Sequence, residues 1–305
     1  MVADLLHNPH PCPTHIIAFP STPQEQQQLT CCHYHYNYHH HDHHHQVNTS
    51  RMGSLTTHLL TLTPATLHTS TTHPFLHAAG TSTLSKATLS AWLSQDRLYA
   101  QSYIRFIGLL LSKVRLPYTV STTNSSNPSS EPVESRIIAL LTSALLNIRR
   151  ELTFFETVAT EYDLDLTVPP PGETAFGPSE ATHAYTDLFL SAGSSGVTLL
   201  EGLVVLWATE VCYFRAWGFA REIMEKSNTG NDGNGGDADG GALRERFIPN
   251  WTSEEFGVFV DEIGGLVDEI ARGSGEGERE KEMLGRCERW WRQVVWLEGM
   301  FWPEV

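Results

Sequence analysis

The class of fold follows from one segment, GVTLLEGLVVLWATEVCYFRAWGFAREIMEK, which occupies residues 196–226. Apolar side chains cover almost the whole circumference of a helix formed by these residues. A helix that is apolar all round is buried among other elements, whereas a surface helix keeps one polar face. We therefore predict that this segment is the central helix of an all-helical protein.

Helical periodicity continues on both sides of the central segment. Apolar residues recur there at steps of three and four, and no stretch alternates polar and apolar residues as a strand does. The other expected helices are residues 84–116, 133–162, 179–189, 252–270 and 278–302. The pattern predicts the all-α class, as a bundle of about seven helices around an internal pocket.

The beginning of the chain differs in composition from the rest. Eleven of the sixteen His lie before residue 46, and no period gives this part an apolar face to bury. Residues 1–51 are interpreted as a disordered His-rich leader, or as the product of a start upstream of Met52, with a metal-binding tract as the alternative. The helical domain is expected over residues 52–305, with flexible loops at about 121–134 and 227–241.

Charge and cysteine content argue against several classes of protein. The net charge of −15 disfavours nucleic acid and anionic membrane surfaces as partners. No run of about 18 apolar residues is present that could span a membrane. Of five Cys, only Cys212 and Cys287 belong to the helical domain, and they suggest no disulfide framework. We expect a cytoplasmic protein that binds a small molecule.

Three acidic residues lie on apolar faces of three expected helices. Asp96 precedes Tyr99 by three residues, so the two side chains share a helix face. Glu210 lies in the central helix with Tyr213 on its face, and Glu298 lies in the apolar run VVWLEGMFW near the C-terminus. A buried carboxylate without a partner is costly, and its pKa rises so that the group stays neutral.

Two interpretations of these acids are open from the residues alone. The acids can converge on an aromatic-lined pocket, where rings stack on a flat heterocycle and carboxyl groups bind its nitrogen atoms. Alternatively, each acid can pair with a helix end or with an arginine. The arginines available for such pairs are Arg105, Arg215 and Arg221.

Five short motifs occur along the expected helical domain. They are Thr72-His73-Pro74-Phe75-Leu76, Gln95-Asp96-Arg97-Leu98-Tyr99, Thr182-His183-Ala184-Tyr185-Thr186, FIPNWTSEEF at residues 247–256, and Glu298-Gly299-Met300-Phe301-Trp302. In this order they resemble the motifs of the TenA family (thiaminase II, aminopyrimidine aminohydrolase). The resemblance covers nearly all of the chain after Met52.

The resemblance implies a haem-oxygenase-like helical fold without haem, assembled as a homo-tetramer or dimer. It implies hydrolysis of a C–N bond of an aminopyrimidine, or of thiamin, to hydroxymethylpyrimidine, with no metal and no cofactor. By position, Asp96 would hold the ring nitrogen and amino group of the pyrimidine substrate, and Glu298 would transfer protons. The residues expected to bind the substrate are Tyr99, Tyr185, Tyr213, Trp251 and Phe301.

The central helix departs from family members that use a nucleophilic Cys. Glu210 takes that position here, and Cys212 lies about 200° away around the helix. The chain therefore resembles the branch that lacks the Cys, in which the Glu210 carboxylate would activate water as a general base. The alternative is that Cys212 is the nucleophile, although its neighbours in the sequence offer no His to activate it. The predicted catalytic residues are thus Asp96, Glu210 and Glu298. Trp251 stands where the family has a Tyr in the segment that matches residues 247–256. An aromatic side chain therefore still lines the expected pocket, but the Tyr hydroxyl group is absent.

Two other functions are open on the same fold. One is a non-catalytic protein that binds a pyrimidine or a related heterocycle. The other is the oxidative ring chemistry of PqqC-like relatives, which carry His and Arg in their pockets. The absence of His from the central helix argues against this chemistry. The His of the helical domain are His58, His68, His73, His77 and His183.

Overall fold

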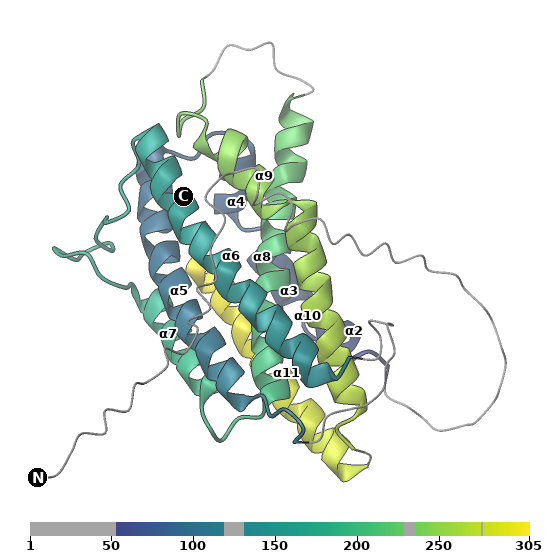
Figure 1. Cartoon of the computed structure of the whole chain (residues 1–305). Helices are drawn as coiled ribbons and strands as arrows, with labels where there is room; N and C mark the ends of the chain where they lie inside the picture. The colour runs from purple at the N-terminus through teal and green to yellow at the C-terminus, as the bar shows by residue number, and fades with distance from the viewer. Residues whose placement is uncertain (1–52, 119–130, 229–235, 276) are drawn as a thin grey trace, which may run out of the picture. The chain divides into compact units, whose positions relative to one another are not determined.

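The structure of the chain is a computed structural model that describes residues 53–118, 131–228, 236–275 and 277–305 (Figure 1). Our predictions for the leader at residues 1–51 lie outside these residues, as do residues 121–130 and 229–235 of the two predicted loops. Every regular element of the described part is a helix, so the predicted all-α class is confirmed. No helix among these residues is long and apolar enough to cross a membrane.

Six long helices form most of the bundle, and each lies within a few residues of its predicted position. They are α5 (Lys86–Lys113), α6 (Val133–Tyr162), α7 (Glu180–Gly193), α8 (Leu199–Asn228), α10 (Glu254–Arg272) and α11 (Glu278–Phe301). Serine side chains cap the backbone at the starts of three of them, as the sequence chemistry favours. These caps are Ser85 for α5, Ser179 for α7 and Ser253 for α10.

Helix α6 ends at Tyr162, as its predicted range of residues 133–162 has it. The residue that closes it is Asp163, which takes a left-handed conformation with φ of 55°, rather than the run Pro169-Pro170-Pro171-Gly172 that we expected to break the helix. A residue in this conformation closes a helix by itself, and Asp tolerates it better than most residues.

Short helical segments supplement the long ones, so the prediction of about seven helices was too low. They are α2 (Leu55–Leu62), α3 (Pro64–Thr71), α4 (Pro74–Gly80), the π-helical turn η2 (Leu243–Phe247) and α9 (Ile248–Trp251). Each is shorter than the window in which a helical period can be recognised. Proline at their first positions, as in α3 and α4, was the available signal.

Helix α8 is the centre of the bundle, as its sequence predicts. It packs against α3, α4, α5, α7, α9, α10 and α11. Its side chains from Leu203 to Ala208 are almost completely buried, because neighbouring helices cover every face of this segment. Figure 1 shows the long helices running roughly side by side, with α8 among them.

An aromatic cluster holds one end of the bundle together. Trp92 of α5 stacks on Trp302, which follows α11, with ring centroids 5.5 Å apart. Trp217 of α8 lies 4.3 Å from Trp251 of α9, measured between centroids. Aromatic pairs at such distances add packing energy beyond the area they bury. The cluster therefore fixes the short helix α9 against α5 and α8.

Candidate active site

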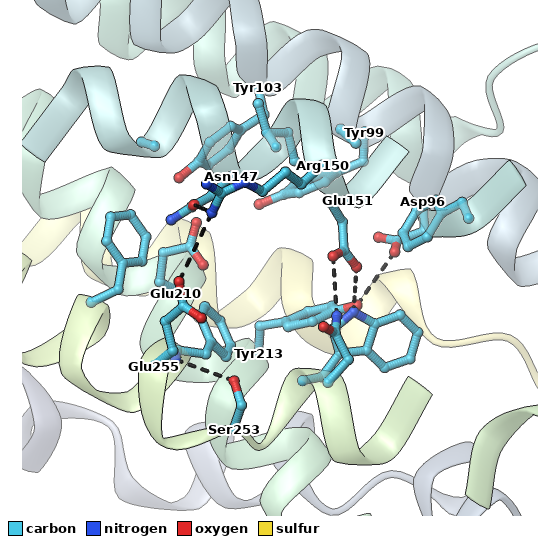
Figure 2. A pocket seen from close by; sticks show the side chains of 18 residues that line it. Asp96, Tyr99, Tyr103, Asn147, Arg150, Glu151, Glu210, Tyr213, Ser253 and Glu255 are labelled. Atoms are coloured by element: carbon cyan, nitrogen blue, oxygen red, sulfur yellow. Dashed lines mark hydrogen bonds and ion pairs between the residues drawn. The ribbon is translucent and has the colours of Figure 1, made fainter. Parts of the chain in front are cut away.

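A cavity of about 220 Å³ lies between α5, α6, α8, α9 and α10 (Figure 2). Carboxyl groups from four helices line it, namely Asp96 of α5, Glu151 of α6, Glu210 of α8 and the exposed Glu255 of α10. Most of the remaining wall is aromatic. The aromatic lining residues are Tyr99, Tyr103, Phe155, Tyr213, Trp251, Phe256 and Phe259. This lining provides ring faces for stacking and carboxyl groups for polar recognition.

Asp96 is held in the cavity wall by a tyrosine. The hydroxyl of Tyr213 donates a hydrogen bond to Oδ2 of Asp96 at 3.3 Å. Asp96 is only 4% exposed, and burial raises the pKa of its carboxyl group well above the usual value. The nearby charge of Glu151 raises this pKa further. Burial therefore favours the protonated form of Asp96, which can both donate and accept a hydrogen bond.

Glu210 lines the same cavity from the central helix. Burial raises the pKa of its carboxyl group to about 7, although a hydrogen bond with Tyr103 acts in the opposite direction. Cys212 is not among the lining residues, and its side chain is completely buried. Burial also raises the pKa of the Cys212 thiol well above its usual range, so the reactive thiolate is disfavoured.

Glu298 lies beside the cavity, outside its lining. The hydroxyl of Tyr185 donates a hydrogen bond to Oε1 of Glu298. Burial raises the pKa of Glu298 to about 8, and the Tyr185 bond partly offsets that rise. Tyr99 connects the Tyr185–Glu298 pair with the cavity. Tyr99 lines the cavity, and its ring centroid lies 5.0 Å from that of Tyr185 and 5.8 Å from that of Phe301.

The predicted site residues thus fall into two adjoining groups. Those that line the cavity are Asp96, Tyr99, Glu210, Tyr213 and Trp251. Glu298, Tyr185 and Phe301 form the second group behind Tyr99. Each group contains at least one carboxyl group whose pKa is raised by burial, which is common at functional sites.

Glu151 is a cavity carboxyl group that our sequence reasoning missed. It accepts hydrogen bonds from Nε1 of Trp251 at 2.5 Å and from Nδ2 of Asn250 at 3.1 Å. In the sequence it follows Arg149 and Arg150, and such a charged run is typical of a solvated face. The signal that could have found it is its spacing of four residues from Phe155, which places both on one helix face.

Arginine pairing, the second interpretation of the acids, does not describe this site. No ion pair among the described residues joins a cation to Asp96, Glu210 or Glu298. Arg221 pairs with Glu225 on the same helix. The described residues also contain no cluster of three or more His, Cys, Asp or Glu placed to hold a metal ion.

Fold and site together define an all-helical protein with an acidic, aromatic-walled cavity. The chain belongs to the TENA/THI-4/PQQC family, whose pattern it matches over residues 62–303. This match confirms the resemblance drawn from the five motifs.

Two curated relatives differ in how they are named. A Fusarium pseudograminearum protein named "Probable transcription factor" is 32% identical over 275 residues, which are 83% of this chain and 52% of the relative. A Glycine max protein named "Probable bifunctional TENA-E protein" is 21% identical over 211 residues, 69% of this chain and 77% of the relative. The chain thus spans about half the length of the Fusarium relative.

Solved structures of TenA homologues share the fold. One from Pyrococcus furiosus is 24% identical, with a TM-score of 0.60 over 81% of this chain and 98% of that one. A structure titled as a TenA family transcription regulator, from Silicibacter, is 16% identical, with a TM-score of 0.59 over 83% and 96%. These similarities confirm the predicted haem-oxygenase-like helical fold.

Proposed function

We propose that the chain hydrolyses a C–N bond of an aminopyrimidine, or of thiamin, and releases hydroxymethylpyrimidine. The observation that carries this proposal is the convergence of Asp96, Glu151 and Glu210 on one aromatic-walled cavity. Burial raises the pKa of all three carboxyl groups. A carboxyl group whose pKa is raised in this way is better suited to proton transfer near neutral pH than an ordinary one.

Asp96 is the proposed recognition group for the pyrimidine. An aminopyrimidine presents a ring nitrogen that accepts a hydrogen bond, next to an amino group that donates one. A neutral carboxyl group presents the complementary donor and acceptor. The Tyr213 hydroxyl holds Oδ2 of Asp96, which leaves Oδ1 to carry the proton. Tyr99 and Trp251 would then flank the ring.

Glu210 is the proposed general base. Its pKa of about 7 lies near the working pH, where such a base is most effective. It takes a proton from water while the water oxygen forms a bond to the carbon that carries the leaving nitrogen. The C–N bond breaks, and its electron pair stays on nitrogen. In this proposal, no covalent enzyme intermediate forms, and Cys212 takes no part.

Glu298 is the proposed source of the proton for the leaving nitrogen, and since Tyr99 lies between Glu298 and the cavity, the Tyr99 hydroxyl is the proposed relay for this proton. Its pKa of about 8 keeps it protonated at neutral pH. The proton that Glu298 gives up balances the one that Glu210 accepts, so water is consumed and ammonia leaves. The carboxyl groups accomplish these steps without a cofactor.

The proposal is tested by incubating protein that starts at Met52 with a panel of thiamin fragments and thiamin. Turnover is followed by mass spectrometry, and binding by calorimetry. Turnover of an aminomethyl-pyrimidine supports the hydrolase. Tight binding with no turnover across the panel would support a non-catalytic heterocycle-binding protein instead. The Fusarium relative is named as a transcription factor and the Silicibacter structure as a transcription regulator, and neither name describes an enzyme. These names are the reason for testing binding separately from turnover.

Self-association and location are further parts of the proposal. Trp296 and Met300 lie one turn apart on α11 and are 55% and 57% exposed. Exposed large apolar side chains are typical of interaction surfaces, which supports a homo-oligomer. Cys212 and Cys287 are free thiols, which supports the cytoplasm as the location.

A further inference from the structure

Glu151 is a carboxyl group of the cavity that has no part in the proposed reaction. It lies on α6 and faces α9. One of its oxygens accepts from the indole N–H of Trp251, and the other accepts from the side-chain amide of Asn250. Figure 2 shows both hydrogen bonds as dashed lines that end on Glu151. The Glu151 carboxylate thus holds two consecutive residues, Asn250 and Trp251, of the four-residue helix α9.

The contacts of Trp251 connect Glu151 to the recognition group. The Trp251 ring lies 5.6 Å from the ring of Tyr213, whose hydroxyl donates to Asp96. Trp251 is only 3% exposed, so its N–H has no access to bulk water. A buried donor that loses its acceptor destabilises the conformation that buries it. The orientation of the Trp251 ring, which forms part of the cavity wall, therefore depends on Glu151.

Glu151 also brings negative charge to the cavity. The charged and titratable groups with which it interacts there are Asp96, Glu210 and Tyr213. Its charge raises the pKa of both Asp96 and Glu210. Its neighbour Arg150 is 70% exposed at the rim, 4.0 Å from Glu255, and forms no ion pair with Glu151. Among the described residues, no cation forms an ion pair with Glu151.

We propose that Glu151 is a positioning residue of the site, which fixes Trp251 as the wall for a stacked heterocycle and places a negative charge beside Asp96 and Glu210. Only the nature of the ligand, a stacked heterocycle, rests on the proposed function. The positioning of Trp251 and the negative charge can be tested separately with two variants of Glu151. Glu151→Ala removes both the acceptor and the charge, whereas Glu151→Gln keeps an acceptor oxygen for Trp251 and removes the charge.

The first experiment follows the indole N–H resonances of the chain labelled with isotope-enriched tryptophan, without ligand. Trp251→Phe identifies the resonance of Trp251. We expect Glu151→Ala to shift this resonance and to speed its exchange with water, and Glu151→Gln to restore slow exchange. The control is Glu156→Ala, because Glu156 lies on the same helix with a side chain 63% exposed. An unchanged Trp251 resonance in Glu151→Ala would overturn the positioning role.

The second experiment measures the binding of 4-aminopyrimidine by calorimetry across pH. Binding is lost as Asp96 loses its proton at rising pH. Removing the charge of Glu151 lowers the pKa of Asp96, so the midpoint of this loss should fall by about half a pH unit or more in Glu151→Gln. Glu156→Gln should leave the midpoint unchanged. A purely structural role for Glu151 predicts equal midpoints in wild type and Glu151→Gln.

A double-variant comparison tests the pairing itself. Glu151→Ala and Trp251→Phe should each weaken binding about tenfold, as expected for a lost hydrogen bond to a charged group. The double variant should bind no more weakly than the weaker-binding of the two single variants. If its fold loss of affinity equals the product of the two single losses, Glu151 and Trp251 act independently and do not form a functional pair. Binding without turnover in the wild type would refute the hydrolase and leave this proposal standing. With no binding at all, the indole resonance decides the proposal without a ligand.

Discussion

The hydroxyl of Tyr185 donates a hydrogen bond to Oε1 of Glu298, and so joins α7 to α11 across 113 residues of sequence. Both side chains are almost completely buried, at 1% and 5% exposure. The bond favours the ionised form of Glu298 and thereby opposes the rise of its pKa by burial. Tyr99 contacts this pair and also lines the cavity, so the pair lies next to the proposed substrate.

Substitutions of this pair should affect turnover in different ways. We expect Glu298→Gln to lose at least about two orders of magnitude in kcat/KM, since an amide cannot transfer the proton. Tyr185→Phe removes the bond that stabilises the carboxylate, so the pKa of Glu298 rises further. The alkaline limb of the kcat/KM profile should then move to higher pH. A Glu298→Gln variant with wild-type turnover would exclude the acid role.

The central helix offers a choice between two candidate residues. Glu210→Gln should abolish most turnover, because the cavity then lacks its base near neutral pH. Cys212→Ser should retain turnover, because the thiol is completely buried outside the cavity lining. Steady-state kinetics on both variants distinguish the alternatives. Full activity in Glu210→Gln together with an inactive Cys212→Ser would assign the nucleophile to Cys212.

The buried acids also predict how stability depends on pH. In the folded chain the pKa of Glu210 is about 7 and that of Glu298 about 8, both raised from 4.5. Between the unfolded and the folded pKa, the unfolded chain has lost a proton that the folded chain retains. The free energy of unfolding therefore falls as pH rises through this range, by about 1.4 kcal/mol per pKa unit for each group.

Denaturant titrations at pH 5 and pH 8 measure this effect. The double variant Glu210→Gln/Glu298→Gln should show a smaller loss of stability between the two pH values than the wild type, because the amides do not titrate. An equal loss in both proteins would mean that the two carboxyl groups keep ordinary pKa values in the folded chain.

The packing of α4 on α8 can be tested at one glycine. A Cβ atom on Gly80 would contact the backbone oxygen of Ala220 and lie 2.7 Å from Cβ of Ile223. Gly80→Ala should therefore cost about 1–3 kcal/mol of unfolding free energy. Gly108→Ala is the matched control, because nothing lies within 4 Å of its added Cβ atom. Alanine there should stabilise the exposed helix interior by about 0.5–1 kcal/mol.

Periodicity predicted the long helices because each buries a repeated apolar stripe. The end of α6 at Tyr162 was predicted as well, but its cause was not, since Asp163 closes the helix before the prolines are reached. The four-residue α9 escaped prediction for a different reason. It is fixed by tertiary contacts of Trp251 with Phe247, Trp217 and Glu151, which have no local pattern.

The site was predictable where polar residues interrupt an apolar face. Asp96 and Glu210 are such interruptions, and both line the cavity. Glu151 is different, because two arginines precede it and its environment comes from α9, about a hundred residues later in the chain. The separation of Glu298 from the cavity by Tyr99 was also beyond sequence reasoning, since it depends on how the rings of three helices pack.

The proposed activity of this cavity is the hydrolysis of an aminopyrimidine C–N bond by its own carboxyl groups. The most direct measurement is the release of ammonia and hydroxymethylpyrimidine from an aminomethyl-pyrimidine, with wild type and Glu210→Gln compared in the same buffer without added metal. We expect equal amounts of the two products from the wild type, and a rate lower by at least about two orders of magnitude from the variant. Binding of the substrate by the wild type with no ammonia above the Glu210→Gln background would contradict it.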